Sequence, residues 1–223
     1  MADARRILGE RKAGVIFDVG ANTGQTCVRL AAAFPGAKVF SFEPFPGSFA
    51  TLEAECRRLP GVEPVNVALG EQAGELEMFA NANSETNSIL PATSAAEAWL
   101  PSSMIGRVGS VKIAVQTADA FCDERGLARI DLMKIDTQGY ELHVLRGAQR
   151  MLAQRKVSVI NLEVQFVDFY EGQPAFTQLF EHLAAIGMTF VGLYSAAYSS
   201  QNRLLWADAL FASEEVVGKG SSY

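Results

Sequence analysis

The stretch at residues 15–34 constrains the fold more than any other part of the chain. An apolar run at 15–19 precedes a turn that contains Gly20 and Gly24, and this turn leads into a helical pattern at 25–34. A buried strand that passes through a glycine turn into a helix is the first unit of many nucleotide-binding α/β folds. The sequence therefore predicts an α/β domain with a ligand site at this turn.

The same alternation continues along the chain. Further strands are predicted at 38–42, 64–68, 130–135 and 157–164. Further helices are predicted at 48–59, 139–153 and 176–186. Strand-like stretches at 189–193 and 205–212, separated by the polar residues 194–203, predict a hairpin with an antiparallel last strand. We therefore expect a mostly parallel sheet with helices on both faces.

The alternation is interrupted after the third predicted strand. Residues 75–80 and 111–117 alternate polar and apolar side chains, which is typical of antiparallel strands. Between them lies segment 84–110, rich in Ser, Ala, Asn and Pro. A long connection after a ligand-binding strand is either a plain surface loop or a lid over the substrate. We expect an inserted loop and hairpin here, with 84–110 as the candidate substrate lid.

Composition limits the remaining possibilities. A chain of 223 residues fits one domain over 1–223, and its net charge of −6 argues against nucleic acid as a partner. Its three cysteines are far apart, which favours a reducing compartment over a disulfide framework. The sequence has neither a signal-peptide pattern nor an uncharged stretch of transmembrane length. We therefore expect a cytoplasmic protein with no membrane partner.

The turn at residues 18–24, D-V-G-A-N-T-G, has only two glycines, and Asn22 occupies its middle. A dinucleotide turn needs its glycines so that backbone N–H groups can approach a pyrophosphate. S-adenosylmethionine carries no phosphate, and Asp18 can receive its amino group directly or through water. Glu43 ends the second predicted strand, where an acid can accept hydrogen bonds from ribose hydroxyls. The turn and the acid together predict a ligand that contains a nucleoside. S-adenosylmethionine fits the turn best because it carries no phosphate.

A second motif, D-L-M-K-I-D-T-Q-G-Y-E-L-H-V-L-R-G-A, runs from residue 131 to residue 148. Asp136 falls at the carboxyl end of a central strand, where open α/β sheets bind their ligands. Glu141 lies in the first turn of the next helix, where the helix dipole by itself favours an acid. With D-V-G-A-N-T-G and F-E-P, this motif resembles the FkbM family of S-adenosylmethionine-dependent methyltransferases. Val67-Ala68-Leu69-Gly70 and Asn87-Ser88 also resemble that family, and the resemblance extends over about 15–193.

The resemblance implies a class I methyltransferase fold (Rossmann-like) that acts on a hydroxyl of a sugar, glycan or secondary metabolite. It implies that the methionine end of the cofactor is held by Asp18, Gly20 and Asn22. Glu43 would hold the ribose, and Asp136 would lie where cofactor and acceptor meet. The residues implied near the adenine are Val67 and Ala68. The chain departs from the family at Gln138, where an acid is frequent, so a role that needs a carboxylate there is absent.

Methylation of a hydroxyl also requires a group that takes the proton. His143 and His182 are poor candidates, because neither is expected to face the crevice. Asp136 and Glu163 lie at the ends of adjacent predicted strands, where they could share a base role or hold Mg²⁺ or Mn²⁺ through oxygen ligands. Glu163 could instead bond only to neighbouring backbone.

Two other functions remain open at this point. One is an NAD(P)-dependent oxidoreductase, although no tyrosine has a lysine four residues later, as the short-chain reductases require. The other is a non-catalytic nucleoside-binding protein, which Gln138 supports best. The sequence determines neither the acceptor nor the oligomeric state.

Overall fold

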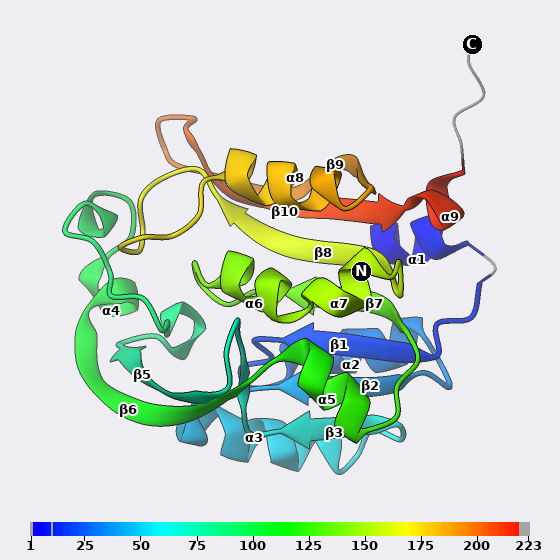
Figure 1. Ribbon diagram of the computed structural model, residues 1–223. Helices are drawn as coiled ribbons and strands as arrows, with labels where there is room; N and C mark the ends of the chain where they lie inside the picture. Colours follow the sequence, from blue (N-terminus) through cyan, green and yellow to red (C-terminus); the bar gives the residue numbers. More distant parts are fainter. Residues whose placement is uncertain (1, 10, 219–223) are drawn as a thin grey trace.

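The computed structural model describes residues 2–9 and 11–218, and a seven-stranded sheet forms its centre (Figure 1). In spatial order the strands are β3 (Val62–Val65), β2 (Lys38–Phe42), β1 (Val15–Val19), β7 (Ile130–Ile135), β8 (Val157–Gln165), β10 (Leu204–Ser213) and β9 (Met188–Tyr198). The first five strands are parallel, and β10 runs antiparallel to both β8 and β9. This order confirms the expected mostly parallel sheet with an antiparallel last strand.

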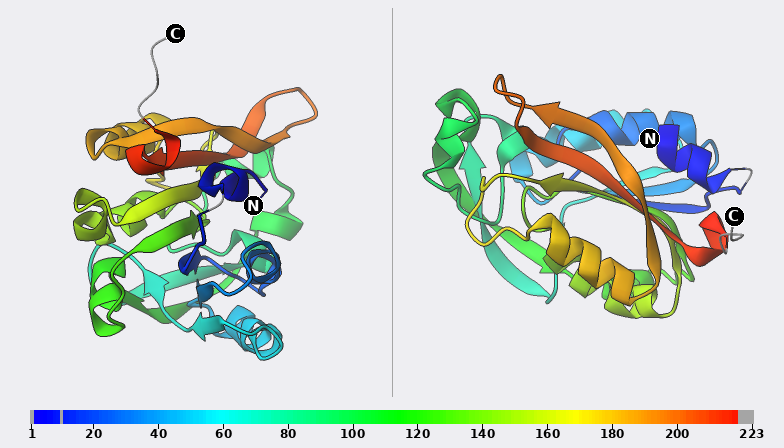
Figure 2. Two further views of the ribbon diagram at one scale, coloured as in Figure 1. Left: turned by 90° about the vertical axis from the view of Figure 1, so that its right-hand side faces the viewer. Right: turned by 90° about the horizontal axis from the view of Figure 1, so that it is seen from above.

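Helices cover both faces of the sheet (Figure 2). One face carries α5 (Ala118–Glu124), α6 (Glu141–Gly147), α7 (Gln149–Ala153) and α8 (Phe176–Ala185). The other face carries α1 (Ala2–Leu8), α2 (Gln25–Ala33) and α9 (Glu214–Val217), with α3 (Pro46–Cys56) beside α2. The sequence pattern did not predict α1 or α9. Parallel strands buried on both faces explain why the predicted strands are continuous apolar runs.

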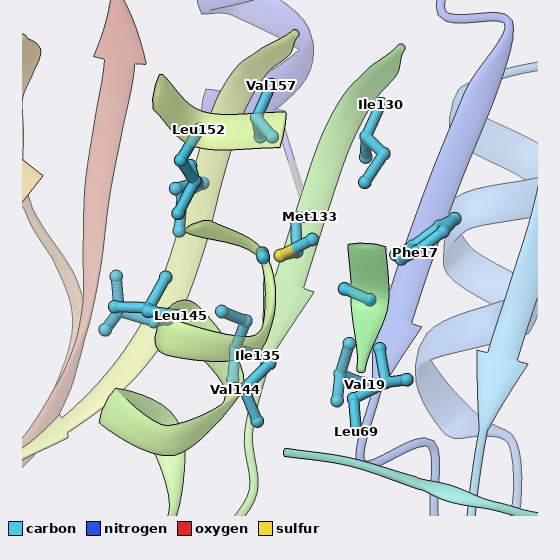
Figure 3. Packing of buried hydrophobic residues seen from close by; sticks show 14 of the residues in the cluster. Phe17, Val19, Leu69, Ile130, Met133, Ile135, Val144, Leu145, Leu152 and Val157 are labelled. Carbon is cyan, nitrogen blue, oxygen red and sulfur yellow. The ribbon is translucent and has the colours of Figure 1, made fainter. Parts of the chain in front are cut away.

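Each face of the large sheet packs against a hydrophobic core, and the larger of these two cores lies between the sheet and helices α5–α8 (Figure 3). Phe17 and Met133 of the sheet and Leu145 of α6 are fully buried in it. Burial of each such side chain contributes about 1.5–3 kcal/mol to the free energy of folding. This packing holds β1 and β7 side by side, so that their carboxyl ends have a defined separation.

The third predicted strand, 64–68, is wrong in its bounds. β3 ends at Val65, and β4 (Ala68–Leu69) belongs to a separate three-stranded sheet with β6 (Arg107–Gln116) and β5 (Gly74–Asn81). The chain turns between them because Val67 N donates to Val65 O, at 3.0 Å. Asn66 holds this turn by donating its amide to Glu43 O at 2.9 Å. The sequence pattern could not show this turn, because Val67 and Ala68 are apolar like the strand before them.

The predicted helix at 139–153 is divided at Ala148 into α6 and α7. Asp119 of α5 causes this division by accepting hydrogen bonds from Arg150 N and Met151 N, at 2.7 and 3.0 Å, at the start of α7. The final hairpin also differs from the prediction, because β9 continues to Tyr198 and leaves only 199–203 as its loop. Among the described residues, no helix is both long and apolar enough to cross a membrane.

Candidate active site

A cavity of about 380 Å³ lies at the carboxyl edge of the parallel strands. Its walls include the residues that follow β1, β2 and β7, the last residues of β8, and the inserted segment after β5. Open α/β sheets bind ligands at this edge, where the connections on opposite faces separate. The predicted site residues that line this cavity are Gly20, Asn22, Glu43, Val67, Ala68, Asp136 and Glu163.

The turn after β1 directs its backbone donors into the protein. Gly20 N and Ala21 N both donate to Phe42 O at 3.0 Å, and Asn22 N donates to Glu43 Oε2 at 2.8 Å. These three N–H groups are therefore engaged and cannot cradle a pyrophosphate. This supports the prediction that the ligand at the turn carries no phosphate at that point.

Gly20 is required at this turn for two reasons. Its φ of +77° lies in the left-handed region, which side chains other than glycine rarely adopt. A Cβ at Gly20 would also lie 1.8 Å from Asp136 O, closer than any two such atoms can approach. The turn after β1 is therefore packed directly against the backbone that follows β7.

Glu43 is 5% exposed, and its two oxygens bond to two different backbone donors. Oε2 accepts from Asn22 N and Oε1 accepts from Phe45 N, both at 2.8 Å. Burial raises the pKa of Glu43 to about 7, although these two hydrogen bonds oppose the rise. Each oxygen keeps a second lone pair, so Glu43 can still accept from hydroxyl groups in the cavity.

Asp18 lies beneath the turn rather than in the cavity wall. Its side chain is fully buried, with Ser41 Oγ 3.4 Å from one oxygen and Lys134 Nζ 3.5 Å from the other. Burial raises the pKa of Asp18, and Lys134 opposes this rise. Asp18 is therefore not part of the cavity wall, and the expectation that it receives the amino group of the cofactor, directly or through water, stays a prediction.

Lys134 connects the two sides of the site. Its ammonium group donates to Gly20 O at 3.1 Å and lies 3.4 Å from Asp136 Oδ2. Burial alone would lower the pKa of Lys134, but the carboxylates of Asp136 and Asp18 raise it above its ordinary value. Lys134 is therefore a buried cation between two acids. The sequence analysis missed it, although a lysine within the apolar run 130–135 was the signal that could have identified it.

Asp136 and Glu163 face each other across the ends of β7 and β8, as the sequence predicts. Gln138 lies between them and donates its amide to Asp136 Oδ1 at 2.8 Å and to Glu163 Oε2 at 2.9 Å. Tyr170 OH donates to Gln138 Oε1 at 2.9 Å. Burial and the neighbouring Asp136 carboxylate raise the pKa of Glu163 well above its ordinary value. The sequence analysis did not predict the contacts of Gln138 and Tyr170, since only the folded chain brings them together.

Glu141 closes the turn that carries Asp136. Its Oε1 accepts hydrogen bonds from Thr137 N and Thr137 Oγ1 at 3.0 Å and from Gly139 N at 3.1 Å. Burial raises the pKa of Glu141 to about 7. Glu141 therefore supports the loop from within and is absent from the cavity wall.

The inserted segment forms one wall of the cavity. Its residues that line the cavity are Ser84, Glu85, Thr86, Asn87, Ile89, Leu100 and Met104. The segment contains two short 3-10 helices, η1 (Ser84–Thr86) and η2 (Ala96–Ala98), and one helical turn, α4 (Ser102–Ile105). Ala96 and Ile105 pack in a small core with Phe169 and Leu205. The segment is therefore a packed wall in this structure, and its opening as a lid stays a prediction.

Neither histidine belongs to the cavity wall. His143 stacks on Tyr140, with ring centroids 4.3 Å apart, and its Nδ1 lies 3.3 Å from Glu71 Oε2. His182 is on α8, and burial lowers its pKa. Within the described parts of the chain, no three His, Cys, Asp or Glu side chains are arranged to hold a metal ion. The two oxygens of Asp136 are instead engaged by Lys134 Nζ, at 3.4 Å, and by the Gln138 amide, at 2.8 Å.

Comparison with known proteins agrees with this geometry. The family described as "Methyltransferase FkbM domain" matches residues 18–190. A 2-O-methyltransferase of Sinorhizobium fredii, NoeI, is 28% identical over 177 residues, which are 74% of this chain and 68% of that protein. The hexuronic acid methyltransferase AglP of Haloferax volcanii is 28% identical over 152 residues, 67% of this chain and 55% of AglP. The chain thus spans about two thirds of one relative and little more than half of the other.

Solved structures agree on the fold. The magnesium protoporphyrin IX methyltransferase of Synechocystis PCC 6803, solved with bound S-adenosylmethionine, superposes with a TM-score of 0.53 at 9% identity. That superposition covers 95% of this chain and 76% of the other. The fold is therefore that of the class I methyltransferases. Because the family match covers well over half of the sequence, the chain belongs to the FkbM family of S-adenosylmethionine-dependent methyltransferases.

Proposed function

We propose that this protein transfers a methyl group from S-adenosylmethionine to a hydroxyl of a sugar, glycan or secondary-metabolite acceptor. One observation carries the proposal: both the turn side and the carboxylate side of the predicted site line a single cavity at the strand edge. The names of two relatives, a 2-O-methyltransferase and a hexuronic acid methyltransferase, support a hydroxyl on a sugar-like acceptor. A cytoplasmic location and the absence of nucleic-acid and membrane partners stay predictions from the sequence.

The residues of the cavity suit this cofactor. Glu43 offers lone pairs for the ribose hydroxyls, and Val67 and Ala68 offer an apolar surface for the adenine. Asn22 Oδ1 is buried and lacks a hydrogen-bond partner among the described residues. An ammonium group at the methionine end would satisfy this oxygen, and an unsatisfied buried acceptor otherwise costs about 1–3 kcal/mol.

The charges of the cavity suit the cofactor as well. Glu85, Asp136 and Glu163 make the wall acidic, which favours a ligand with sulfonium and ammonium groups. Its carboxylate needs a cation, and Lys134 is already paired with two aspartates. The guanidinium of Arg29 lines the cavity and forms no hydrogen bond or ion pair with any described residue. We assign Arg29 to that carboxylate.

Asp136 is the group proposed to take the proton of the acceptor. S-adenosylmethionine supplies an activated methyl group when it is bound. As the acceptor oxygen bonds to the methyl carbon, the bond from that carbon to the sulfonium sulfur would break, S-adenosylhomocysteine would leave with the electron pair, and the Asp136 carboxylate would take the proton of the acceptor. Positioning of the two reactants can supply roughly 7–11 kcal/mol of the rate enhancement. The cavity walls would provide that positioning and exclude water.

Calorimetry tests the cofactor. S-adenosylmethionine and S-adenosylhomocysteine are expected to bind, and NAD is not, because the N–H groups of Gly20, Ala21 and Asn22 are already bonded within the protein and cannot bind a pyrophosphate. Glu43→Ala should weaken binding by about 1–3 kcal/mol, the usual contribution of hydrogen bonds to a charged group. Glu53→Ala on the exposed surface of α3 is the matched control and should bind normally. Binding of NAD with no response to either sulfur nucleoside would refute the proposal.

Transfer of a radiolabelled methyl group tests the reaction. The panel of candidate acceptors should include neutral sugars, uronic acids and glycan fragments. The expected product is a methyl ether of one of them. Cofactor binding without transfer to any acceptor would favour the non-catalytic nucleoside-binding alternative. The oxidoreductase alternative is not favoured by the family match or by the turn.

A further inference from the structure

We infer that Gln138 is a positioning residue: it holds the Asp136–Glu163 pair in place and connects that pair to the inserted wall of the cavity. The role of Asp136 in the reaction rests on the proposed function. The role of Gln138 in holding the pair rests on contacts that exist in the chain itself.

The backbone of Gln138 is held in an unusual conformation. Its φ of +56° lies in the left-handed region, which residues other than Gly, Asn and Asp seldom adopt. Ser88 of the inserted segment is fully buried and donates its hydroxyl to Gln138 O at 2.6 Å. The wall segment therefore anchors the main chain at the residue whose side chain separates the two carboxylates.

The side-chain amide has one consistent orientation. Its nitrogen faces Asp136 Oδ1 and Glu163 Oε2, and its oxygen faces the Tyr170 hydroxyl. A flipped amide would direct its oxygen at two carboxylates and its NH₂ at a hydroxyl, and it would lose both charge-assisted hydrogen bonds. Tyr170 therefore selects the orientation in which Gln138 donates to both acids.

Donation by a neutral amide stabilises the ionised form of each acid, which opposes the effect of burial on Glu163. Each carboxylate accepts its own hydrogen, so the pair does not need to share a proton, as facing carboxylates otherwise do. This leaves Asp136 able to accept a proton from an acceptor hydroxyl. A carboxylate at position 138 would remove both donors and add a third negative charge.

Tyr170 also links the inserted wall of the cavity to Gln138. The Tyr170 hydroxyl is 2.9 Å from Gln138 Oε1 and 3.0 Å from Thr86 O, and Thr86 lines the cavity. A hydroxyl has one hydrogen, so these two acceptors compete for it. A ligand that moves Thr86 would therefore change how firmly Tyr170 holds the Gln138 amide.

The test compares Gln138→Met, Gln138→Glu and Tyr170→Phe in the full chain without ligand. Gln, Met and Glu require the same unusual backbone conformation, so the exchanges at 138 add little backbone strain. Carbon-13 NMR of the labelled carboxyl groups follows the titration of Glu163, which is assigned with Glu163→Gln. The titration midpoint should rise in Gln138→Met, because a donor to the ionised form is lost, and rise further in Gln138→Glu. Tyr170→Phe, which keeps the ring, should give the smallest rise.

Gln201→Met, an exposed exchange in the β9–β10 loop, is the matched control and should leave the midpoint unchanged. Unchanged midpoints in all three test variants, with folded spectra, would overturn the inference. With an acceptor from the transfer screen, Gln138→Met should lower kcat about 10- to 100-fold at unchanged KM for the cofactor. Wild-type kcat and pH profile in that variant would also overturn it. If the midpoints move as expected but no acceptor is ever methylated, the positioning role of Gln138 is supported and the proposed function fails.

Discussion

The cavity has two halves, and each half is stabilised by a different kind of hydrogen bond. In the half proposed to hold the cofactor (the cofactor half), at the ends of β1 and β2, backbone N–H groups bond to Phe42 O and to the Glu43 carboxylate. In the half proposed to hold the acceptor (the acceptor half), at the ends of β7 and β8, side chains bond to side chains: Gln138 joins Asp136, Glu163 and Tyr170. Lys134 and the Gly20 contact with Asp136 O join the halves.

The difference shows which half can change. Any residue except proline can supply a backbone N–H, so the cofactor half depends on glycine conformation and one acid, both at fixed places in the chain. The acceptor half depends on the identity of several side chains from distant segments. We therefore expect exchanges of backbone conformation to be most damaging in the cofactor half, and exchanges of side-chain chemistry to be most damaging in the acceptor half.

Gly20→Ala should have the largest effect. Its Cβ would lie 1.8 Å from Asp136 O, so the turn and the strand end must separate, which we expect to cost more than about 4 kcal/mol of the free energy of unfolding. Urea unfolding and cofactor calorimetry measure the loss. Gly36→Ala is the matched control, because its φ is +86° and its Cβ would meet nothing within 4 Å. It should cost only about 1–2 kcal/mol, and equal losses in the two variants would contradict the close contact.

Asp136→Asn should have the second largest effect, which is a lower rate of methyl transfer. The exchange keeps the size of the side chain and removes its basicity, so the rate at saturating cofactor should fall about 10²–10⁴-fold while cofactor affinity changes little. Single-turnover measurements separate the two effects. The control is Asp168→Asn, an exposed aspartate in the loop after β8, which should keep the wild-type rate. If excess cofactor restored the rate of the variant, Asp136 would instead belong to the cofactor half.

Glu141→Gln should raise stability in a pH-dependent way. The pKa of Glu141 is about 7 in the folded chain and about 4.5 ordinarily, so the folded state binds the proton more tightly. The stability that Glu141 contributes is therefore full below about pH 4.5 and is lost as the pH rises through 7. Since one oxygen accepts all the hydrogen bonds of Glu141, glutamine can keep them. Urea unfolding at pH 8 should show a gain of at most about 3 kcal/mol, which disappears at pH 4.

Glu43→Gln, in the cofactor half, provides a direct comparison with Glu141→Gln. Two backbone donors use the two different oxygens of Glu43, and the amide nitrogen of glutamine cannot accept from either. Glu43→Gln should therefore be less stable than Glu141→Gln at pH 8. Equal gains in both variants would show that the backbone bonds of the cofactor half contribute little.

Removal of divalent ions should have no effect. The amide hydrogens of Gln138 and the ammonium group of Lys134 already occupy oxygens of Asp136 and Glu163 that a metal would bind. Methyl-transfer rates after dialysis against a chelator, with and without added Mg²⁺ or Mn²⁺, provide the measurement. A rate that falls on chelation and returns with either ion would mean that Gln138 turns away to admit a metal.

The sequence by itself determined the main alternation of strands and helices, and it placed Gly20, Asn22 and Glu43 at one edge of the sheet. Apolar runs and glycine turns are local signals, and an acid at the end of a strand is placed by the strand itself, as Glu43 illustrates. For the same reason, Asp136 and Glu163 could be assigned to one edge before the fold was known. The bounds of the strand near Val67 were wrong because a contact with a distant residue sets the turn: Asn66, within the turn, donates its amide to Glu43 O, 23 residues earlier in the chain.

Only the tertiary structure decided what surrounds the two acids. Gln138, which in the sequence argued against catalysis, donates to both of them, and Tyr170 fixes its orientation from 32 residues away in the chain. Asp18 lies outside the cavity wall, 3.5 Å from the ammonium group of a buried lysine on the neighbouring strand. Such contacts join residues without local spacing, because packing brings their strands and loops together, and packing is a property of the whole chain.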